Sequence, residues 1–484
     1  MISLVLYFIF FSTNITPQNV FWDHYTLIPP LGEIKSIVAS PFSLFAISDN
    51  YLLFLNKQPL SLEKTIYFDR AIELLGYDKW YDDLWITQNS TIIRLTIVSY
   101  SIREYEIPAG VDKIGISQDY VYLVSSKSYS LDKRTGDIAI VNAFPNDVMW
   151  YRKTRGSDLR DYTFLSPYYY YDEPKESQTP FYQFPITALY DDGMYLYVGT
   201  RQFGILQYNK VSWQKQRLIY GPVDSRIEKI RKLNNTVYFI SPSGISYFAS
   251  GGRQWRYHRF AREVADILPL KNYFVMSFEN RLSRFDGGMV FSISNFPTDV
   301  ISLSQDEENL YVGTKTGLFK IIKETDIPLP FGPDRYAVHA IYPTENAVYV
   351  GDDFAFYSYD RGEDSWLKVL NFGIKDIVEL KNDLYLLGVN NQLIKYRTSE
   401  GDAIGADSNW ILLPYFNVYD IDSDGEVLYC ASYAGIYYYE PETELYKVIY
   451  NLPRIRYDYI FVMDDTLVTL SNGVIYSLPL EYRD

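Results

Sequence analysis

Apolar residues recur along the chain in short runs that are separated by polar turns, and no long stretch has helical spacing. The clearest runs begin at Leu196 and Leu310, where Leu-Tyr-Val-Gly-Thr is followed by a tight turn and a second apolar run. Short runs bounded by turn residues are typical of β-strands. The pattern therefore predicts an all-β protein.

The runs belong to a repeating unit. Twelve markers, each the third residue of the second predicted strand, are spaced by about 38 residues, because 422 residues span the eleven intervals. The markers are Ala46, Ile86, Leu123, Phe164, Val198, Phe239, Val275, Val312, Val350, Leu386, Cys430 and Val468. Each unit predicts four short strands, which indicates a β-propeller of about twelve four-stranded blades. The Phe164 unit is degenerate, because Tyr168–Tyr171 stands where other units carry Gly and Leu.

Two glycines mark the point where the second strand of a unit turns into the third. Gly199 and Gly313 follow the Tyr-Val pair of the two clearest copies. A glycine there predicts either a positive φ or a close approach of another segment.

Twelve units exceed the four to eight that usually form one ring, so we expect two rings. The segment Pro174–Pro180 is the most linker-like stretch. We favour a seven-bladed propeller at 185–450, inserted into a five-bladed propeller made of 18–184 plus 451–484. A division into six and six units, or one very wide ring, is an alternative. Val20–Leu27 reads as an isolated strand, which we expect to complete the last blade and to remove two exposed sheet edges.

The N-terminus carries the apolar run Leu4–Phe11. The run is too short to span a bilayer and fits a signal peptide within residues 1–17, with a short buried strand as the alternative. No other stretch approaches 18 apolar residues. We therefore expect an exported protein, periplasmic, cell-surface or secreted, without a transmembrane anchor after signal cleavage.

Composition narrows the classes of function. Hydrophobic residues make up 47% of the 484 residues, enough for a large core, and the 48 tyrosines favour β-structure. The net charge of −15 argues against a nucleic acid as partner. Cys430 is the single cysteine, which excludes an internal disulfide and a cysteine zinc site, and three histidines argue against a multi-histidine metal site.

The motif Leu310-Tyr-Val-Gly-Thr-Lys-Thr-Gly-Leu318 resembles the propeller repeat of the two-component-regulator type. The resemblance implies a bacterial, exported protein that binds or signals rather than catalyses. The sequence shows no kinase or DNA-binding region, so signalling would require a separate protein. The motif is structural and implies no functional residues.

Asp420-Ile-Asp-Ser-Asp-Gly425 matches the start of a calcium loop, because Asp420, Asp422 and Asp424 alternate and a glycine follows. The ninth and twelfth places of such a loop carry Leu428 and Ala431 instead of acids. A polar turn is therefore the alternative to a calcium site. No other cofactor is predicted.

Loops between the second and third strands of a blade help to form the face where propellers usually bind ligands. Asp352 replaces the Thr of Val-Gly-Thr, so Asp352 and Asp353 form a carboxylate pair in such a loop. On the same face we expect Arg201, Phe203, Glu279, Lys315, Asn390, Asn391 and Tyr433. Their mixed charge favours a polar or protein partner. His339, in an innermost strand, is either a base that faces a central channel or a structural histidine.

Two further segments have competing interpretations. Arg253–Arg262 interleaves cations with aromatic residues, which suits stacking or an anionic partner, or else an outer edge strand guarded by charge. Tyr168–Tyr171 is either a carbohydrate-stacking patch or core of the degenerate unit.

The leading hypothesis is a non-catalytic exported scaffold that recognises a protein or a glycan through loops on a propeller face. The alternative is a glycan-active enzyme, a lyase or hydrolase, with its site in a propeller funnel. A third possibility is a partner of an envelope sensor or a component of envelope assembly. The motifs G-x-S-x-G, Walker A, G-x-G-x-x-G and H-E-x-x-H do not occur.

Overall fold

The computed structural model describes residues 24–483 except 108–109, 163, 166–167, 172–181, 234–235, 250–254, 261, 271–272, 288, 324, 399–408 and 415–416. The predicted signal segment 1–17 lies outside the described residues. In the described part, the strands form eleven antiparallel sheets, nine with four strands and two with five. Two short 3-10 helices are present there, η1 (Asp158–Asp161) and η2 (Leu480–Tyr482). The prediction of an all-β protein is confirmed, and the arrangement is consistent with a multi-blade β-propeller.

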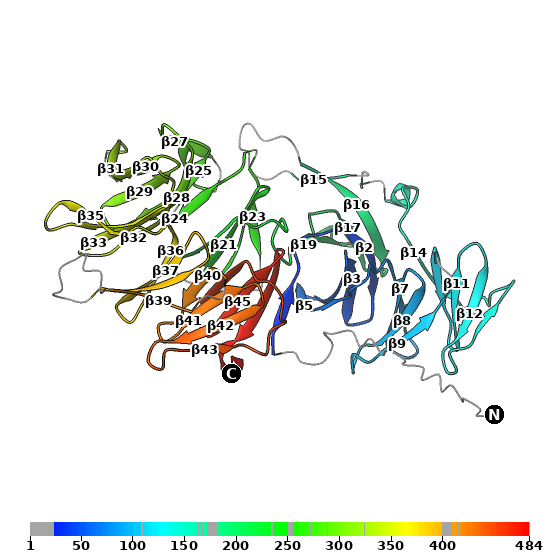
Figure 1. Cartoon of the computed structure of the whole chain (residues 1–484). Coiled ribbons are helices and arrows are strands. Elements are labelled where there is room, and N and C mark those ends of the chain that lie inside the picture. The colour runs from blue at the N-terminus through cyan, green and yellow to red at the C-terminus, as the bar shows by residue number, and fades with distance from the viewer. Residues whose placement is uncertain are drawn as a thin grey trace, which may run out of the picture.

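The N-terminal part forms four sheets, which we call the four-sheet group (blue to teal in Figure 1). Its strands are β2 (Ile34–Ala39), β3 (Ser43–Ser48), β4 (Tyr51–Lys57), β5 (Leu60–Tyr67), β6 (Leu74–Asp78), β7 (Asp83–Gln88), β8 (Thr91–Thr96), β9 (Ile102–Glu106), β10 (Lys113–Ile116), β11 (Tyr120–Val124), β12 (Ser128–Asp132), β13 (Ile138–Ile140), β14 (Met149–Arg152), β15 (Tyr168–Tyr171), β16 (Tyr182–Asp191), β17 (Tyr195–Thr200), β18 (Ile205–Asn209) and β19 (Lys215–Leu218). The innermost strands β2, β6, β14 and β16 surround a cavity of about 500 Å³.

The remaining seven sheets, which we call the seven-sheet ring, run from green to red in Figure 1. Their strands are β20 (Lys229–Leu233), β21 (Thr236–Ser241), β22 (Gly244–Ala249), β23 (Arg256–His258), β24 (Asp266–Pro269), β25 (Phe274–Phe278), β26 (Arg281–Phe285), β27 (Val290–Asn295), β28 (Val300–Gln305), β29 (Asn309–Thr314), β30 (Gly317–Ile322), β31 (Pro328–Asp334), β32 (Val338–Pro343), β33 (Ala347–Asp352), β34 (Phe356–Asp360), β35 (Ser365–Leu370), β36 (Ile374–Leu380), β37 (Asp383–Gly388), β38 (Leu393–Arg397), β39 (Trp410–Leu412), β40 (Val418–Ser423), β41 (Leu428–Ser432), β42 (Gly435–Glu440), β43 (Leu445–Val448), β44 (Tyr459–Met463), β45 (Thr466–Ser471) and β46 (Val474–Pro479), together with β1 (Thr26–Ile28).

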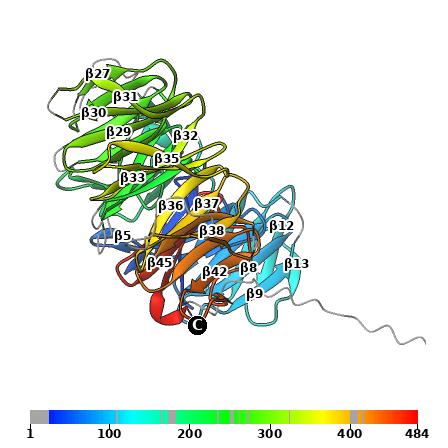
Figure 2. The ribbon, with the colours of Figure 1, turned by 60° about the vertical axis from the view of Figure 1, so that its left-hand side comes forward.

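The first strands of these seven sheets contact one another in sequence order, from β20 through β24, β28, β32, β36 and β40 to β44. Figure 2 shows the sheets of β29, β33, β37 and β42 following one another. The ring closes between β44 and β20, where the Tyr459 hydroxyl donates to the Glu228 carbonyl at 2.6 Å. The sequence predicts seven units at 185–450. The sheets of the ring run instead from β20 to β46, because the sheet of β16–β19 packs on β2 of the four-sheet group.

Eleven of the twelve markers lie in the second strand of their repeat unit. The exception is Phe164, which lies in a turn and is exposed. The degenerate unit forms no sheet of its own: β14 joins β10 as a fifth strand of one sheet, and β15 joins β16 as a fifth strand of another. Twelve four-stranded blades are therefore not what the described residues form.

The predicted N-terminal closing strand is present. β1 pairs antiparallel with β46, with Thr26 opposite Ser477 and Ile28 opposite Ile475. The described strand begins later than the predicted segment Val20–Leu27, of which residues 20–23 lie outside the described part. The sheet of β44–β46 thereby gains its fourth strand.

The glycine of the repeat is needed for close approach between sheets. A Cβ on Gly313 would lie 2.6 Å from the Val338 carbonyl oxygen of the next sheet, and one on Gly199 would lie 2.4 Å from a methyl group of Ile34. The Thr after each glycine closes the following turn, because Thr314 Oγ1 donates to the Gly317 carbonyl at 2.9 Å. The Val-Gly-Thr motif thus encodes both sheet packing and the turn.

Apolar contacts join the two parts of the molecule. Tyr220 is fully buried between them, and its hydroxyl lies 2.8 Å from Ser48 Oγ. Phe203 of the β17–β18 turn contacts Tyr257 of β23, with ring centroids 6.4 Å apart. In the described residues, no helix has the length and apolar character needed to cross a bilayer.

Candidate functional site

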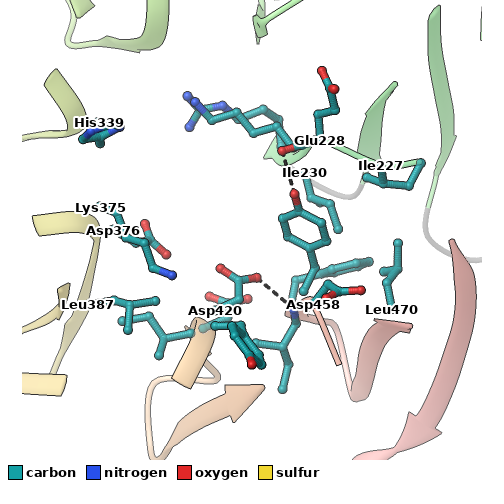
Figure 3. A pocket seen from close by; sticks show the side chains of 18 of the residues that line it. Ile227, Glu228, Ile230, His339, Lys375, Asp376, Leu387, Asp420, Asp458 and Leu470 are labelled. Atoms are coloured by element: carbon teal, nitrogen blue, oxygen red, sulfur yellow. Dashed lines mark hydrogen bonds between the residues drawn. The ribbon is translucent and has the colours of Figure 1, made fainter. Parts of the chain in front are cut away.

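A cavity of about 1130 Å³ lies at the centre of the seven-sheet ring (Figure 3). Residues from the first strand of every sheet, or from the segment just before it, line the cavity. Both signs of charge are present in its wall. The charged lining residues are Arg226, Glu228, Lys229, Arg231, Lys232, Lys375, Asp376, Asp420, Asp422, Arg456 and Asp458. The cavity is therefore suited to a polar ligand rather than an apolar one.

Four consecutive inner strands each contain a β-bulge at their first residues. We call the end of the cavity at which these residues lie its mouth. The register shifts between Val300 and Ser302 in β28, and equivalent shifts occur in β32, β36 and β40. The bulge residues are Ile301, His339, Lys375 and Tyr419, and all four line the cavity. Bulges re-aim side chains and are common beside binding sites. We call these four residues the bulge row.

Turn residues of the same sheets hold the polar members of the bulge row. His339 Nε2 lies 2.7 Å from Asp353 Oδ1, and Lys375 Nζ donates to Asn391 Oδ1 at 2.7 Å. Two of the residues predicted from sequence, Asp353 and Asn391, therefore lie at the mouth, where each orients a side chain that faces the cavity.

The row continues through amide and guanidinium groups. Asn391 Nδ2 donates to Asn417 Oδ1 at 3.0 Å, and Asn417 Nδ2 donates to the Tyr419 hydroxyl at 3.2 Å. The Arg456 guanidinium lies 4.5 Å from the centre of the Tyr419 ring, and its Nε donates to Asp458 at 2.8 Å. A continuous set of hydrogen-bonded polar groups thus surrounds part of the mouth.

On one side of the cavity, three charged groups form a closed network. Lys229 and Arg231 of β20 both pair with the fully buried Asp266, with Lys229 Nζ 2.7 Å from Oδ2 and Arg231 Nε 2.8 Å from Oδ1. Burial opposes ionisation of this carboxyl, but the two cations lower the pKa of Asp266 below its ordinary value. Since Asp266 also accepts from the Leu303 amide, this network joins three sheets.

Three carboxyl groups line another part of the wall. Asp376 lies on β36, and Asp420 and Asp422 lie on β40; Figure 3 shows Asp376 and Asp420 beside the cavity. Asp420 accepts from the Ile460 amide at 2.8 Å and Asp422 from the Val462 amide at 2.7 Å. Asp376 accepts only from the adjacent Ile377 amide among the described residues, at 2.9 Å.

The carboxyls raise one another's pKa. Burial raises the pKa of Asp376 to about 6, although Arg231 opposes the shift. Burial and then the charge of Asp376 raise the pKa of Asp420 well above its ordinary value. Burial also lowers the pKa of the Lys375 ammonium. Asp376 is therefore a group of this wall that can exchange a proton near neutral pH.

Five turns of the seven-sheet ring carry seven of the residues that the sequence placed on one face. These residues are Glu279, Lys315, Asp352, Asp353, Asn390, Asn391 and Tyr433. Asp352 is the last residue of the second strand β33, and the other six lie between the second and third strands of their sheets. Lys315 is paired with Asp299 at 2.6 Å and lies outside the cavity wall, and Glu279, Asn390 and Tyr433 are exposed.

Asp352 stabilises the turn that follows β33, a structural role that was not predicted from the sequence. The side chain is buried, and its Oδ1 accepts from the Phe354 and Ala355 amides at 2.7 and 2.6 Å. It thus closes the same turn that Thr closes in other sheets. Of the carboxylate pair, Asp353 is the member that reaches the cavity mouth.

Arg201 and Phe203 are separated from the other candidates, because their turn belongs to the four-sheet group. Arg201 pairs with Glu33 at 3.0 Å. Phe203 is fully buried and stacks on Phe184, with ring centroids 4.4 Å apart. The prediction that these two side chains share a ligand face with the rest is wrong, since their sheet packs on β2.

The acids of the candidate calcium loop do not converge. Asp420 and Asp422 lie within a strand and bind the amides of β44, whereas Asp424 accepts from the Val427 amide at 2.9 Å and from the Tyr429 hydroxyl at 2.8 Å. Among the described residues, no group of three His, Cys, Asp or Glu side chains could hold a metal ion. The described geometry therefore gives calcium no site there.

The basic segment Arg253–Arg262 contributes the outer strand β23 of its sheet. Trp255, Tyr257 and Phe260 are buried, so its aromatic residues belong to the core. Tyr168–Tyr171 forms the strand β15, and its side chains lie outside the described part.

Sequence reasoning missed Lys375, Asp376, Tyr419 and Arg456. A signal was present for the first three. The inner strands read Ile374-Lys-Asp, Val418-Tyr-Asp, Val300-Ile-Ser and Val338-His-Ala, with the bulge residue always between a β-branched residue and a small or acidic one. Aligning the units on their first strands, rather than on the glycine motif, would have selected these positions.

No family model matches this chain, and no curated protein matches it. Similar solved structures include the extracellular domain of a putative one-component system, BT4673, from B. thetaiotaomicron, at 12% identity and TM-score 0.43, covering 93% of this chain and 76% of that one. They also include PorZ, a surface component of the type-IX secretion system of Porphyromonas gingivalis, at 13% identity and TM-score 0.33, covering 92% and 79%. The computationally designed Ika8 protein is similar at 13% identity and TM-score 0.43, covering 61% and 96%. With TM-scores below 0.5, these likenesses carry no inference about function.

Proposed function

We propose that this chain is a non-catalytic exported binding protein, and that its ligand, a glycan or a polar part of a protein, docks on the seven-sheet ring at the mouth of the central cavity. The observation that carries the proposal is the bulge row: three consecutive sheets each direct a polar side chain toward one cavity and secure it with a turn residue. Preorganised polar groups around a cavity are typical of ligand sites.

Export and sensing belong to the same proposal. The apolar run Leu4–Phe11 supports export, and a role beside an envelope sensor or in envelope assembly would use the same ligand face. We further propose that the seven-sheet ring and the four-sheet group are two domains. Their boundaries would fall near residues 29 and 219, in place of the division at 185 and 450.

The test is binding by the full chain. Glycan and protein arrays, together with pull-down from an envelope fraction, should recover a ligand whose binding is lost in Tyr419→Ala. The control is Tyr129→Ala, on β12 of the four-sheet group. Arrays and pull-downs without any specific ligand would contradict the proposal, as would equal effects of the two substitutions.

A second candidate, glycan hydrolysis in the same cavity, is favoured by the carboxyls of Asp376 and Asp420. Because the buried carboxyls of Asp376 and Asp420 both have a raised pKa, the pair can hold one proton near neutral pH, which one carboxyl donates to a glycosidic oxygen while the other acts as base. Screening polysaccharide cleavage with the wild-type chain and Asp376→Asn distinguishes the candidates. Cleavage that Asp376→Asn abolishes would replace the binding proposal with the enzyme.

A further inference from the structure

The three polar members of the bulge row present complementary hydrogen-bonding groups. With Asp353 as acceptor, His339 Nε2 carries its proton and Nδ1 is left as an acceptor. Lys375 uses one N–H on Asn391, so two remain. The Tyr419 oxygen accepts from Asn417, so its O–H can donate. The row therefore offers an acceptor, a cationic donor and a hydroxyl donor in sequence along the mouth.

Two cations, Lys375 and Arg456, lie at this part of the mouth, with the carboxyls of Asp376, Asp420 and Asp458 near them. Lys375 comes from β36 and Arg456 from the segment before β44, with β40 between these two strands, and the Arg456 guanidinium lies over the ring of Tyr419 on β40. Asp458 takes only the Nε side of the Arg456 guanidinium. A guanidinium and an ammonium can together bind an anionic group such as a carboxylate through charge-assisted hydrogen bonds.

An exposed aromatic pair lies beside the row. The Tyr336 and Phe354 rings lie 4.4 Å apart and are 42% and 60% exposed. Phe354 directly follows Asp353, the residue that orients His339. Aromatic side chains in such a position provide an apolar surface for the C–H face of a sugar ring.

We propose, on the basis of the proposed function, that the mouth recognises an acidic saccharide. The carboxylate of a uronic acid residue pairs with Lys375 and Arg456, a hydroxyl of the saccharide donates to His339 Nδ1, and a neighbouring sugar ring stacks on Tyr336 and Phe354. An acidic peptide would satisfy the cations but would leave the hydroxyl acceptor and the aromatic surface unused.

Calorimetry with the full chain tests this assignment. The probes are an oligogalacturonate, a neutral galacto-oligosaccharide of equal length, galacturonate monomer and a polyglutamate peptide. We expect the oligogalacturonate to bind at least tenfold more tightly than the neutral oligosaccharide or the peptide. The monomer should bind more weakly than the oligomer, because it cannot reach the aromatic pair and the cations together.

Variants identify the site. Lys375→Met should weaken oligogalacturonate binding at least tenfold, Lys375→Arg should retain most of it, and His339→Gln should weaken it severalfold. The matched control is Lys381→Met, in the turn at the opposite end of the same sheet, where Lys381 pairs with Glu442 at 2.8 Å. Thermal unfolding confirms that each variant is folded.

Several results would overturn the assignment. Equal affinity for acidic and neutral saccharides, equal or tighter binding of polyglutamate, or equal effects of Lys375→Met and Lys381→Met would each do so. A different ligand that binds at the mouth, shown by loss of binding in Tyr419→Ala, would leave the proposed function intact while excluding the acidic saccharide. Absence of any ligand for the wild-type chain would remove both.

Discussion

At the scale of single residues, polar side chains of the inner strands connect neighbouring sheets. Ser302 Oγ donates to the Val338 carbonyl at 2.6 Å, and Asp420 accepts from the Ile460 amide. Asp376 occupies the position equivalent to Asp420, directly after a bulge, but its carboxyl makes no such connection among the described residues. Asp376 is thus an acid placed in the wall without the structural contact that its equivalents make.

The pH dependence of stability should reveal this difference. The pKa of Asp376 is raised to about 6, so the folded state binds the proton more tightly than the unfolded chain. Its contribution is fully present below the ordinary carboxyl pKa and is lost as the pH rises through about 6. Asp376→Asn should therefore raise the free energy of unfolding by about 2 kcal/mol at pH 7.5 and change it little at pH 4.

Chemical denaturation at the two pH values measures the effect. The control is Asn390→Ala, an exposed turn residue whose substitution removes no ionisable group. A loss of stability in Asp376→Asn at pH 7.5 would show that the ionised carboxylate has a favourable partner in the fold.

Asp306 stabilises the turn between β28 and β29, the first and second strands of their sheet. Asp306 accepts from the Asn309 amide at 2.7 Å, from the Tyr311 hydroxyl at 2.7 Å and from Arg361 at 2.6 Å. Although burial opposes ionisation, the bonds from Arg361, Tyr311 and Asn309 lower the pKa of Asp306 to about 2. Asp424 and Tyr429 form the same contact in another sheet, which explains a Tyr at this place in the repeat.

Because the folded-state pKa of Asp306 is depressed, its contribution is present above the ordinary carboxyl pKa and is lost as the pH falls toward 2. Asp306→Asn should lower the free energy of unfolding by about 1 kcal/mol at pH 7, after allowance for solvent screening. The loss should shrink as the pH falls from 5 to 3. Urea titrations over this range provide the measurement, and a loss that is constant with pH would contradict the ionic origin.

At the scale of the sheet, the glycine before the second turn sets the distance to the next sheet. A Cβ on Gly313 would lie 2.1 Å from Ser302 Oγ and 2.6 Å from the Val338 carbonyl oxygen. The backbone atom cannot move without shifting β32. Gly313→Ala should therefore lower the free energy of unfolding by about 1–3 kcal/mol.

Gly156 is the matched control, because a Cβ there would meet no atom within 4 Å and its φ is not positive. Thermal unfolding of both variants makes the comparison. Equal stability of Gly313→Ala and Gly156→Ala would show that the sheets can separate without loss, and would remove close approach as the reason for the motif.

At the scale of the sheet, the repeat predicts where strands lie better than it predicts how they combine into sheets. The repeat predicted the second strand of eleven units, and in three of them a glycine directly follows the marker, at Gly199, Gly313 and Gly351, where the packed sheets leave room only for a small residue. The prediction was wrong at Phe164, because a strand pattern does not show whether a segment forms a new sheet or adds an edge strand to a neighbouring sheet. The bulge row was not predicted, because a bulge turns a side chain in a new direction without changing the hydrophobic pattern of the strand. Asp353 and Asn391 were found only because they lie in turns that topology brings to one face.

At the scale of the whole molecule, the chain enters the seven-sheet ring with β1, passes through the four-sheet group and returns at β20. The division into rings could not be read from unit spacing, because the spacing is nearly constant across the boundary between β19 and β20. Tertiary contacts separate the two parts, because Ile34 packs on Gly199 and so joins β2 to the sheet of β16–β19. Sequence neighbours are thus not always neighbours in a ring.

Pairing of β1 with β46 completes the last sheet of the seven-sheet ring. β1 contributes only three residues, but it pairs with Ile475–Ser477 and covers the edge of β46. A chain that begins at residue 29 should unfold at a temperature several degrees lower than one that begins at residue 24, because the sheet of β44–β46 loses its outer strand and Ile28 leaves the cluster around Phe461 and Val468. Hydrogen exchange should rise in β44–β46 and in β20, where the ring closes, while β6–β8 of the four-sheet group stay protected. Faster exchange spread evenly over both parts would show that the molecule opens as one unit, and unchanged exchange in β46 would show that three residues of pairing do not close the ring.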